Sequence, residues 1–275
     1  MAKEEVFLQI GHVKTTNKLK WQGIPQWLSV ILTLMGMVIV WQLLYVFFTI
    51  PKYILPSPWD IAVRFSQETG MLIRHSLVTL QEVLLGFLMS VAVGIPIAIL
   101  IVHSKYFKNT IYPILIGVHC IPMVSLAPLL IIWLGFDMKT KVIIAFMISV
   151  FPIIINSVVG MQSMDKEMHD LARSLRASKW QIFLYFRLPK ALPNIFGGFK
   201  VGITLAVVGA VVAEFVASDK GLGYLQLMAN SQLDTTLEFC TLFMLAIIGI
   251  GLFYGMDLIE RVAIPWNKGQ RGKSE

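Results

Sequence analysis

The stretch MDKEMHDLARSLRASKWQIFLYFRLPKALP, residues 164–193, is the longest polar interruption in an otherwise apolar sequence. It carries six lysines and arginines and three acids. Four apolar residues within it recur at helical spacing: Met164, Met168, Leu171 and Leu175. This periodicity predicts an amphipathic helix on one face of a membrane, not a disordered run of charges.

Both halves of this segment carry helix-boundary signals. Asp165 is placed to cap the first helix, and Ser178 followed three residues later by Gln181 predicts a second helix that starts with a capping box. The Leu-Pro pairs at 188–189 and 192–193 are expected to stop helical structure twice, because proline lacks the N–H that a helix interior needs. We therefore expect two short helices followed by a proline stop.

The composition excludes a soluble domain. Of 275 residues, 56% are hydrophobic and 14% are charged, whereas a soluble chain carries about a quarter charged residues. The net charge of +7 could indicate nucleic-acid binding, but in a membrane protein it is expected from lysines and arginines kept in cytoplasmic loops. Cys120 and Cys240 lie in apolar runs and are expected to be free, buried thiols.

Six apolar segments are long enough to cross a membrane. The first is about 35 Å long as a helix, against a hydrocarbon core of about 30 Å. The predicted spans are 27–49, 77–103, 111–134, 142–161, 195–216 and 237–262. An interfacial helix is expected at 58–75. Three prolines interrupt the third span, which is expected to be a broken helix lining a pathway or a kinked structural helix.

An even number of spans puts both termini on one side of the membrane. Sixteen lysines and arginines in the tails, loops and span ends lie on that side, and six lie on the other. Because positive residues are retained in the cytoplasm, both termini and the 164–193 segment are predicted to be cytoplasmic. The expected organisation is a tail at 1–26, a transmembrane domain at 27–266 and a second tail at 267–275.

Two spans carry small residues at four-residue spacing, which lets another helix approach closely. In the second span these residues are Gly86, Ser90 and Gly94. In the fifth span they are Gly198, Gly202, Ala206 and Ala210. Both rows are therefore predicted to be helix-packing faces.

Ionisable residues inside spans are costly, and each is a functional hypothesis. Glu214, near the outer end of the fifth span, and Glu82, in the second, are candidates for an outer gate or a substrate pathway. A structural hydrogen bond at a helix contact is the alternative for both. The third span adds His119, Met123 and Ser125, with packing as the alternative. No histidine or cysteine spacing of a metal site is present, so none is predicted.

The 164–193 segment resembles the cytoplasmic signature of ABC-importer permeases. That signature is Glu-Ala-Ala, three residues, Gly, nine residues, Ile, one residue and Leu-Pro. Here every spacing is kept, and the positions hold Asp170, Leu171, Ala172, Arg176, Phe186, Leu188 and Pro189. Other segments are similar to the branch that imports nitrate, sulfonates, taurine and pyrimidine vitamin precursors: ILPSP (54–58), IPMVSLAPLLIIWLG (121–135), SLRASKWQIF (174–183) and AEFVASDKGLG (213–223).

The resemblance implies an all-α membrane protein with the type I ABC-importer permease fold, in the plasma (inner) membrane. It implies no catalysis by this chain, since a partner ATPase would bind ATP and Mg²⁺. The expected partners are cytoplasmic ABC ATPase subunits, a second copy of the chain, an extracytoplasmic substrate-binding protein and membrane lipid, without nucleic acid. The implied ATPase-coupling residues are Asp170, Leu171, Ala172, Leu175, Arg176, Ser178, Phe186, Leu188 and Pro189.

The implied cargo is a sulfonate, taurine or nitrate-like anion or a pyrimidine vitamin precursor. The alternative class is a self-sufficient secondary transporter or channel, which would need coupling acids near mid-membrane; the few acids here lie towards the span ends.

Four positions depart from the signature, one of them Phe186 in place of Ile. Asp170 replaces Glu and keeps the charge with a shorter reach, and Leu171 replaces Ala. Arg176 stands where the family has Gly, a residue that supplies a left-handed backbone at helix ends. That conformation costs another residue about 1 kcal/mol. Either Arg176 accepts this strain or the turn is built differently here.

Overall fold

The structure is a computed structural model that describes residues 25–267, and all regular secondary structure in this range is helical. The chain divides into two compact units after Ile50. In the first, α1 (Gln26–Phe48) is apolar on every side, and most of its described side chains are exposed. At 23 residues it is about 35 Å long, enough to cross a bilayer.

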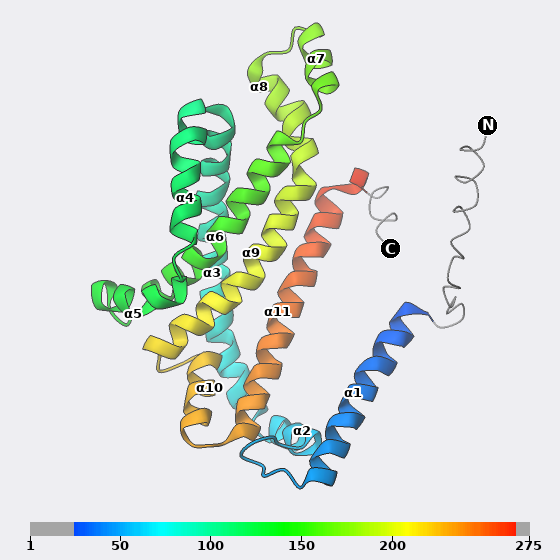
Figure 1. The fold of residues 1–275 in the computed structure, drawn as a ribbon, viewed down its shortest axis with the longest axis vertical. Coiled ribbons are helices and arrows are strands. Elements are labelled where there is room, and N and C mark those ends of the chain that lie inside the picture. The colour runs from blue at the N-terminus through cyan, green and yellow to red at the C-terminus, as the bar shows by residue number, and fades with distance from the viewer. Residues whose placement is uncertain (1–24, 268–275) are drawn as a thin grey trace, which may run out of the picture. The chain divides into compact units, whose positions relative to one another are not determined.

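The second unit holds the remaining helices (Figure 1). Their bounds are α2 (Pro58–Gln67), α3 (Thr69–His103), η1 (Phe107–Ile111), α4 (Tyr112–His119), α5 (Met123–Leu134), α6 (Met138–Gln162), α7 (Lys166–Ser174), α8 (Lys179–Gln181), η2 (Ile182–Arg187), α9 (Leu188–Ala217), α10 (Leu222–Ser231), α11 (Thr235–Ala263) and η3 (Pro265–Asn267). Of these, η1 and η2 are π-helical and η3 is a 3₁₀ turn.

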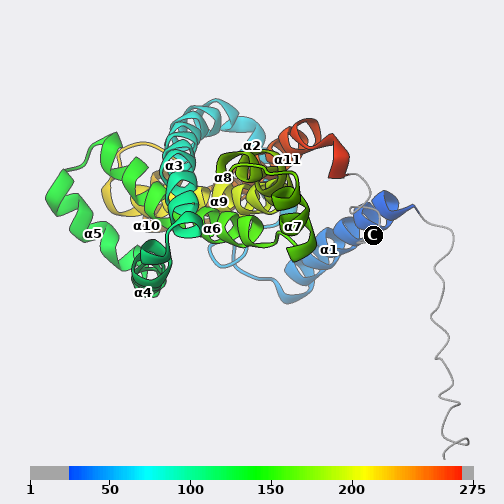
Figure 2. The ribbon, with the colours of Figure 1, turned by 90° about the horizontal axis from the view of Figure 1, so that it is seen from above.

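Five stretches in the described residues are long and apolar enough to span a membrane, and a bent pair would make a sixth. The five contain α1, α3, α6, α9 and α11. The bent pair joins Phe107–His119 to Met123–Leu134 at 93°, and Figure 2 shows α5 leading away from α4. The predicted all-helical class is confirmed, and the count of six spans holds if the bent pair is one span.

The centre of the second unit is α6, which packs between α3 and α9. A Cβ added at Gly86 of α3 would lie 2.6 Å from Cβ of Ala145, and one added at Gly209 of α9 would lie 2.7 Å from its Cα. Both helices therefore approach α6 as closely as glycine allows. Farther along, Ser90 Oγ of α3 lies 2.6 Å from Ser149 Oγ of α6.

The structure places both small-residue rows on buried helix faces. Gly86, Ser90 and Gly94 of α3 are buried against α6, with Gly94 next to Ile153. On α9, added Cβ atoms at Gly198 and Gly202 would meet α6 at Asn156 and Ile153. Ala206 and Ala210 are fully buried.

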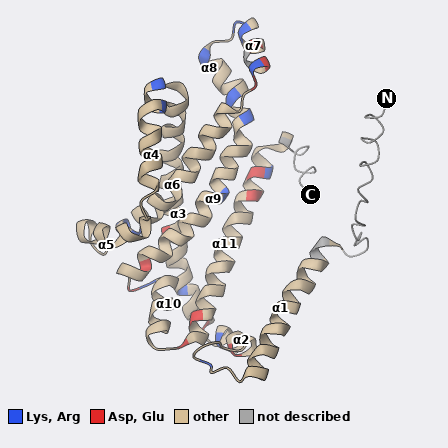
Figure 3. Cartoon of the chain, viewed as in Figure 1, with Lys and Arg blue, Asp and Glu red and all other residues tan. Residues whose placement is uncertain are grey.

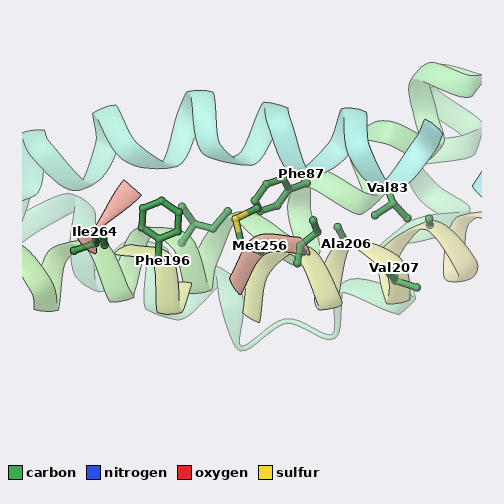
Figure 4. Close-up of a cluster of buried hydrophobic side chains, with 10 residues drawn as sticks. Val83, Phe87, Phe196, Ala206, Val207, Met256 and Ile264 are labelled. Atoms are coloured by element: carbon green, nitrogen blue, oxygen red, sulfur yellow. The ribbon is translucent and has the colours of Figure 1, made fainter. Parts of the chain in front are cut away.

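A cluster of larger buried side chains ties α3 and α9 to α11 (Figure 4). Phe87 of α3 lies beside Met256 of α11, and Phe196 contributes from α9. In lipid this packing gives van der Waals contact, not a hydrophobic driving force, so close fit matters more than apolar character.

Two predicted boundaries were wrong. The prolines of the 188–193 region do not stop the helix: η2 continues into α9, with Pro189 in its first turn and Pro193 inside it. Local π-helical adjustment satisfies the backbone groups that proline frees in a membrane helix. The interfacial helix, predicted at 58–75, ends at Gln67. Glu68 separates it from α3, which starts at Thr69.

Candidate functional site

The segment 164–193 follows the end of α6 as α7, a short link, α8 and η2, and its last residues form the start of α9 (Figure 1). Asp165 occupies the N-cap of α7, but its side chain makes no capping hydrogen bond. Its carboxylate pairs instead with Nζ of Lys190. The predicted capping role of Asp165 was therefore wrong; the ion pair ties the start of α7 to the first turn of α9.

The end of α7 turns through a left-handed residue. Arg176 has φ +54°. The N–H of Ala177 donates to the carbonyl of Ala172 at 3.1 Å, and the N–H of Arg176 donates to that of Arg173 at 2.9 Å. These two bonds are the Schellman pattern, which normally uses glycine at this position. Of the two alternatives left by the sequence, Arg176 accepts the strain.

The next helix starts with the expected capping box. Ser178 Oγ accepts from the N–H of Gln181 at 3.3 Å, and Gln181 Oε1 accepts from the N–H of Ser178 at 2.7 Å. With the left-handed turn, this box satisfies backbone groups at the end of α7 and the start of α8, which gives the link a defined shape.

The residues of the signature divide into buried and exposed sets. Ala172 is fully buried, whereas Leu171, Leu175 and Trp180 are 56%, 67% and 66% exposed. Asp170, Arg176 and Ser178 are exposed, and Phe186, Leu188 and Pro189 are half-buried. The predicted apolar stripe of α7 is thus only partly covered by this chain: Met164 and Met168 are half-buried, but both leucines face outwards. We call Leu171, Leu175 and Trp180 the exposed apolar patch.

The broken pair α4–α5 holds three further candidates. His119 stacks on Phe151 of α6, with ring centroids 3.8 Å apart. Together with Met123 it lines a cavity of about 100 Å³ whose other lining side chains are aliphatic residues, Met147 and Phe151. Ser125 is exposed and does not line this cavity. Cys120, at the break, is exposed, so its predicted burial was wrong, while Cys240 is buried.

Glu82 of α3 forms a buried ion pair with Lys141 of α6. Lys141 lies near the start of α6, which begins at Met138. The carboxylate is fully buried and accepts from Lys141 Nζ at 2.7 Å. Lys141 also donates to Ser218 Oγ, just beyond α9, at 2.8 Å. The sequence reasoning missed Lys141 because a lysine at the edge of a predicted span is usually solvated, and its partner is distant in sequence.

Glu214 of α9 holds the loop that leads into α10. Its Oε1 accepts from Thr79 Oγ1 at 2.7 Å, and its Oε2 accepts from the N–H of Gly223 at 2.6 Å. Thr79 Oγ1 in turn accepts from the N–H of Leu222 at 2.9 Å. At Gly221 the backbone has φ +108° and a Cβ would overlap the Glu214 carboxylate, so glycine is required there.

The two acids belong to one buried cluster, because Glu82 and Thr79, which donates to Glu214, lie one turn apart on α3. Three helices, α3, α6 and α9, and the loop before α10 are joined through it. Both oxygens of Glu214 are occupied by hydrogen bonds of this chain, which agrees with the structural alternative in this conformation. The described residues contain no group of three or more side chains that could hold a metal ion.

Replacing Lys141 with Met should leave the buried Glu82 carboxylate without its cation. Breaking such a pair costs about 3–5 kcal/mol, so the thermal midpoint of the purified chain should fall steeply. The double variant Glu82→Leu/Lys141→Met should recover most of the loss. Lys139→Met, at an exposed position two residues away, is the control. A Lys141→Met chain that melts like the wild type would contradict the role of this pair.

Comparison with known proteins adds three findings. A family described as "Binding-protein-dependent transport system inner membrane component" matches residues 90–268. The riboflavin transport system permease protein RibX of Chloroflexus aurantiacus is 36% identical over 258 residues, which cover 92% of this chain and 94% of that protein. The formylaminopyrimidine transport permease protein ThiX of Halalkalibacterium halodurans is 30% identical, covering 79% of this chain and 88% of that protein.

A sulfonate permease and a solved structure extend the comparison. The putative aliphatic sulfonates transport permease protein SsuC of Bacillus subtilis is 29% identical and covers 90% of both chains. An inward-facing structure of the MetNI methionine ABC transporter matches with a TM-score of 0.64 at 16% identity, covering 71% of this chain and 97% of that one; this likeness concerns the fold alone. The chain belongs to the family of binding-protein-dependent transport system inner membrane components and is a multi-pass inner-membrane permease of the ABC transporter class.

Proposed function

We propose that this chain is the membrane subunit of an ATP-driven importer, that it works as a homodimer, and that α7 docks on a cytoplasmic ATPase. The observation that carries the proposal is the exposed apolar patch, whose two leucines lie on a polar segment outside the candidate spans. Exposed apolar groups ringed by charge are typical of protein interaction sites, not of a solvated loop.

The shape of the α7–α8 link supports a docking role. A Schellman turn and a capping box hold the two short helices at fixed angles, so the patch presents its side chains without an ordering cost at binding. Lys and Arg outnumber Asp and Glu in the segment 164–193 (Figure 3), which suits an acidic partner surface and the cytoplasmic side of the membrane. The ATPase would bind ATP and Mg²⁺, and a substrate-binding protein would deliver solute on the opposite side.

We further propose that the solute is an uncharged heterocycle, of the class to which pyrimidine vitamin precursors belong, and not a sulfonate or nitrate. The cavity beside His119 is lined by apolar and aromatic side chains, with neither lysine nor arginine among those described. Anion pathways usually carry such cations, whereas a flat ring can stack on aromatic side chains. The relatives named for riboflavin and formylaminopyrimidine are 36% and 30% identical, against 29% for the sulfonate permease of Bacillus subtilis.

The docking proposal is tested by replacing the two exposed leucines together, Leu171→Ser and Leu175→Ser. Because both are exposed, the fold should be kept. Loss of two apolar contacts at an interface should weaken capture of the ATPase subunit by at least about tenfold, measured by pull-down and by ATP-dependent uptake in proteoliposomes. Leu233→Ser, an exposed leucine between α10 and α11, is the matched control. Unchanged ATPase affinity would count against docking, and full uptake without the ATPase would favour a self-sufficient transporter.

The strain at Arg176 predicts a gain from glycine. Arg176→Gly should remove about 1 kcal/mol of left-handed backbone cost, and hydrogen exchange at the N–H of Ala177 should slow several-fold. Arg176→Ala removes the guanidinium but keeps the cost, so it should not slow exchange. If the two variants exchange alike, the side chain and not the backbone sets the stability of this turn.

The substrate class is tested by uptake through the reconstituted complex with its binding protein. Riboflavin or formylaminopyrimidine should be taken up, and taurine should not compete. His119→Ala should raise the KM for the heterocycle by several-fold because the stacked ring is lost, while Ser125→Ala, outside the cavity, should leave it unchanged. Saturable taurine uptake without heterocycle uptake would overturn the proposed class.

A further inference from the structure

A basic cavity of about 450 Å³ lies where α3 and α6 end and α7 begins. Three cations from separate segments line it: Lys108 of η1, Lys166 of α7 and Arg187 of η2. Its apolar lining comes from Val102, Met161 and Met164. Figure 3 shows this end of the second unit to be rich in Lys and Arg.

Arg187 is the most informative member of the lining. Its Nε is buried and has no hydrogen-bond partner among the residues that the structure describes. Neighbouring Lys190, by contrast, is paired with Asp165. The described lining of the cavity contains no acid. A buried donor without an acceptor costs about 1–3 kcal/mol, and more when it is charged, so an anion at this point would remove a real penalty.

A second hollow of about 270 Å³ is also lined by Arg187. Its polar lining is again basic, from His103 and Lys179, and no acid is among its described lining residues. Arg187 therefore lines two cavities, and the described lining of neither contains a carboxylate.

We propose that this basic cavity binds a phosphate group, supplied by the headgroup of an anionic phospholipid. Guanidinium binds phosphate oxygens through two parallel N–H donors, and flanking lysines add charge. The cavity lies at the level where α3 ends at His103 and α6 at Gln162, which is where headgroups meet spanning helices. Basic pockets between transmembrane helices at this depth bind anionic headgroups, and the apolar lining suits the start of the acyl chains.

Such a lipid would join three segments that no ion pair among the described residues connects at the cavity: η1, the start of α7, and η2. The docking segment would then be anchored to the membrane surface as well as to α9. This inference does not depend on an ATPase, since it concerns only the ends of the spans and the cations between them.

The experiment uses the full-length chain, purified, delipidated and supplied with phosphatidylglycerol or phosphatidylcholine, with retained lipid counted by native mass spectrometry. The wild type should prefer phosphatidylglycerol. Arg187→Gln should weaken that preference by at least about tenfold, and Lys105→Gln, an exposed lysine at the same end but outside the cavity, should not. Because Arg187 is partly buried, the double variant Lys108→Gln/Lys166→Gln, at exposed positions, gives a second test without risk to the fold.

The two sources of phosphate are separated by adding inorganic phosphate alone. If inorganic phosphate stabilises the wild type and displaces phosphatidylglycerol, and both effects vanish in Arg187→Gln, the site takes phosphate in either form. If only the lipid responds, the headgroup is the ligand. Equal retention of both lipids by the wild type, with no response to phosphate, would overturn the proposal. So would an Arg187→Gln chain that binds phosphate normally but loses the ATPase, because the arginine would then serve that partner.

Discussion

The contact of α3 and α9 with Ala145 of α6 is the constraint on which the second unit depends. Gly86 and Gly209 each leave room for that one small residue, and a single added Cβ would overlap it from either side. Lipid offers helices no hydrophobic reason to associate, so close van der Waals packing and a few hydrogen bonds must hold them together. The Ser90–Ser149 hydroxyl pair, one turn beyond Gly86, is one such hydrogen bond.

The buried charges follow from this same contact. Lys141 lies one helical turn before Ala145, and Glu82 one turn before Gly86, so helices that touch at the glycine bring the ion pair together. Glu214 lies about one turn beyond Gly209 on α9 and reaches the same place. The cluster thus forms where three helices are already held close, and it fastens the loop before α10 with groups that water would otherwise have to solvate. At this end the helix packing thus brings the charged residues together.

Features encoded within a few residues could be read from the sequence, whereas features made across the chain could not. The Ser178–Gln181 capping box, the small-residue rows and the break near Pro122 all depend on local spacing. Lys141 could not be recognised as a buried partner of Glu82, because 59 residues separate them and a lysine beside a turn is ordinarily solvated. The predicted capping by Asp165 also failed because its carboxylate pairs with Lys190, which is distant in sequence. The helix continues through Pro189 after a π-helical segment, and no pattern of residues predicts such a segment.

That continuation has a mechanical consequence. From Lys179 to Val216 the chain is one apolar span of 38 residues, about 57 Å long at 1.5 Å per residue, and its π-helical portion lies near the capped end. The first end of this span, at Lys179, follows the link after α7. The other end carries Glu214 in the buried cluster. A rod of this length that tilts by about 10° displaces one end relative to the other by roughly 10 Å. Small movements imposed at the capped end would therefore reach the hydrogen bonds of Glu214 at the other end of the same helix.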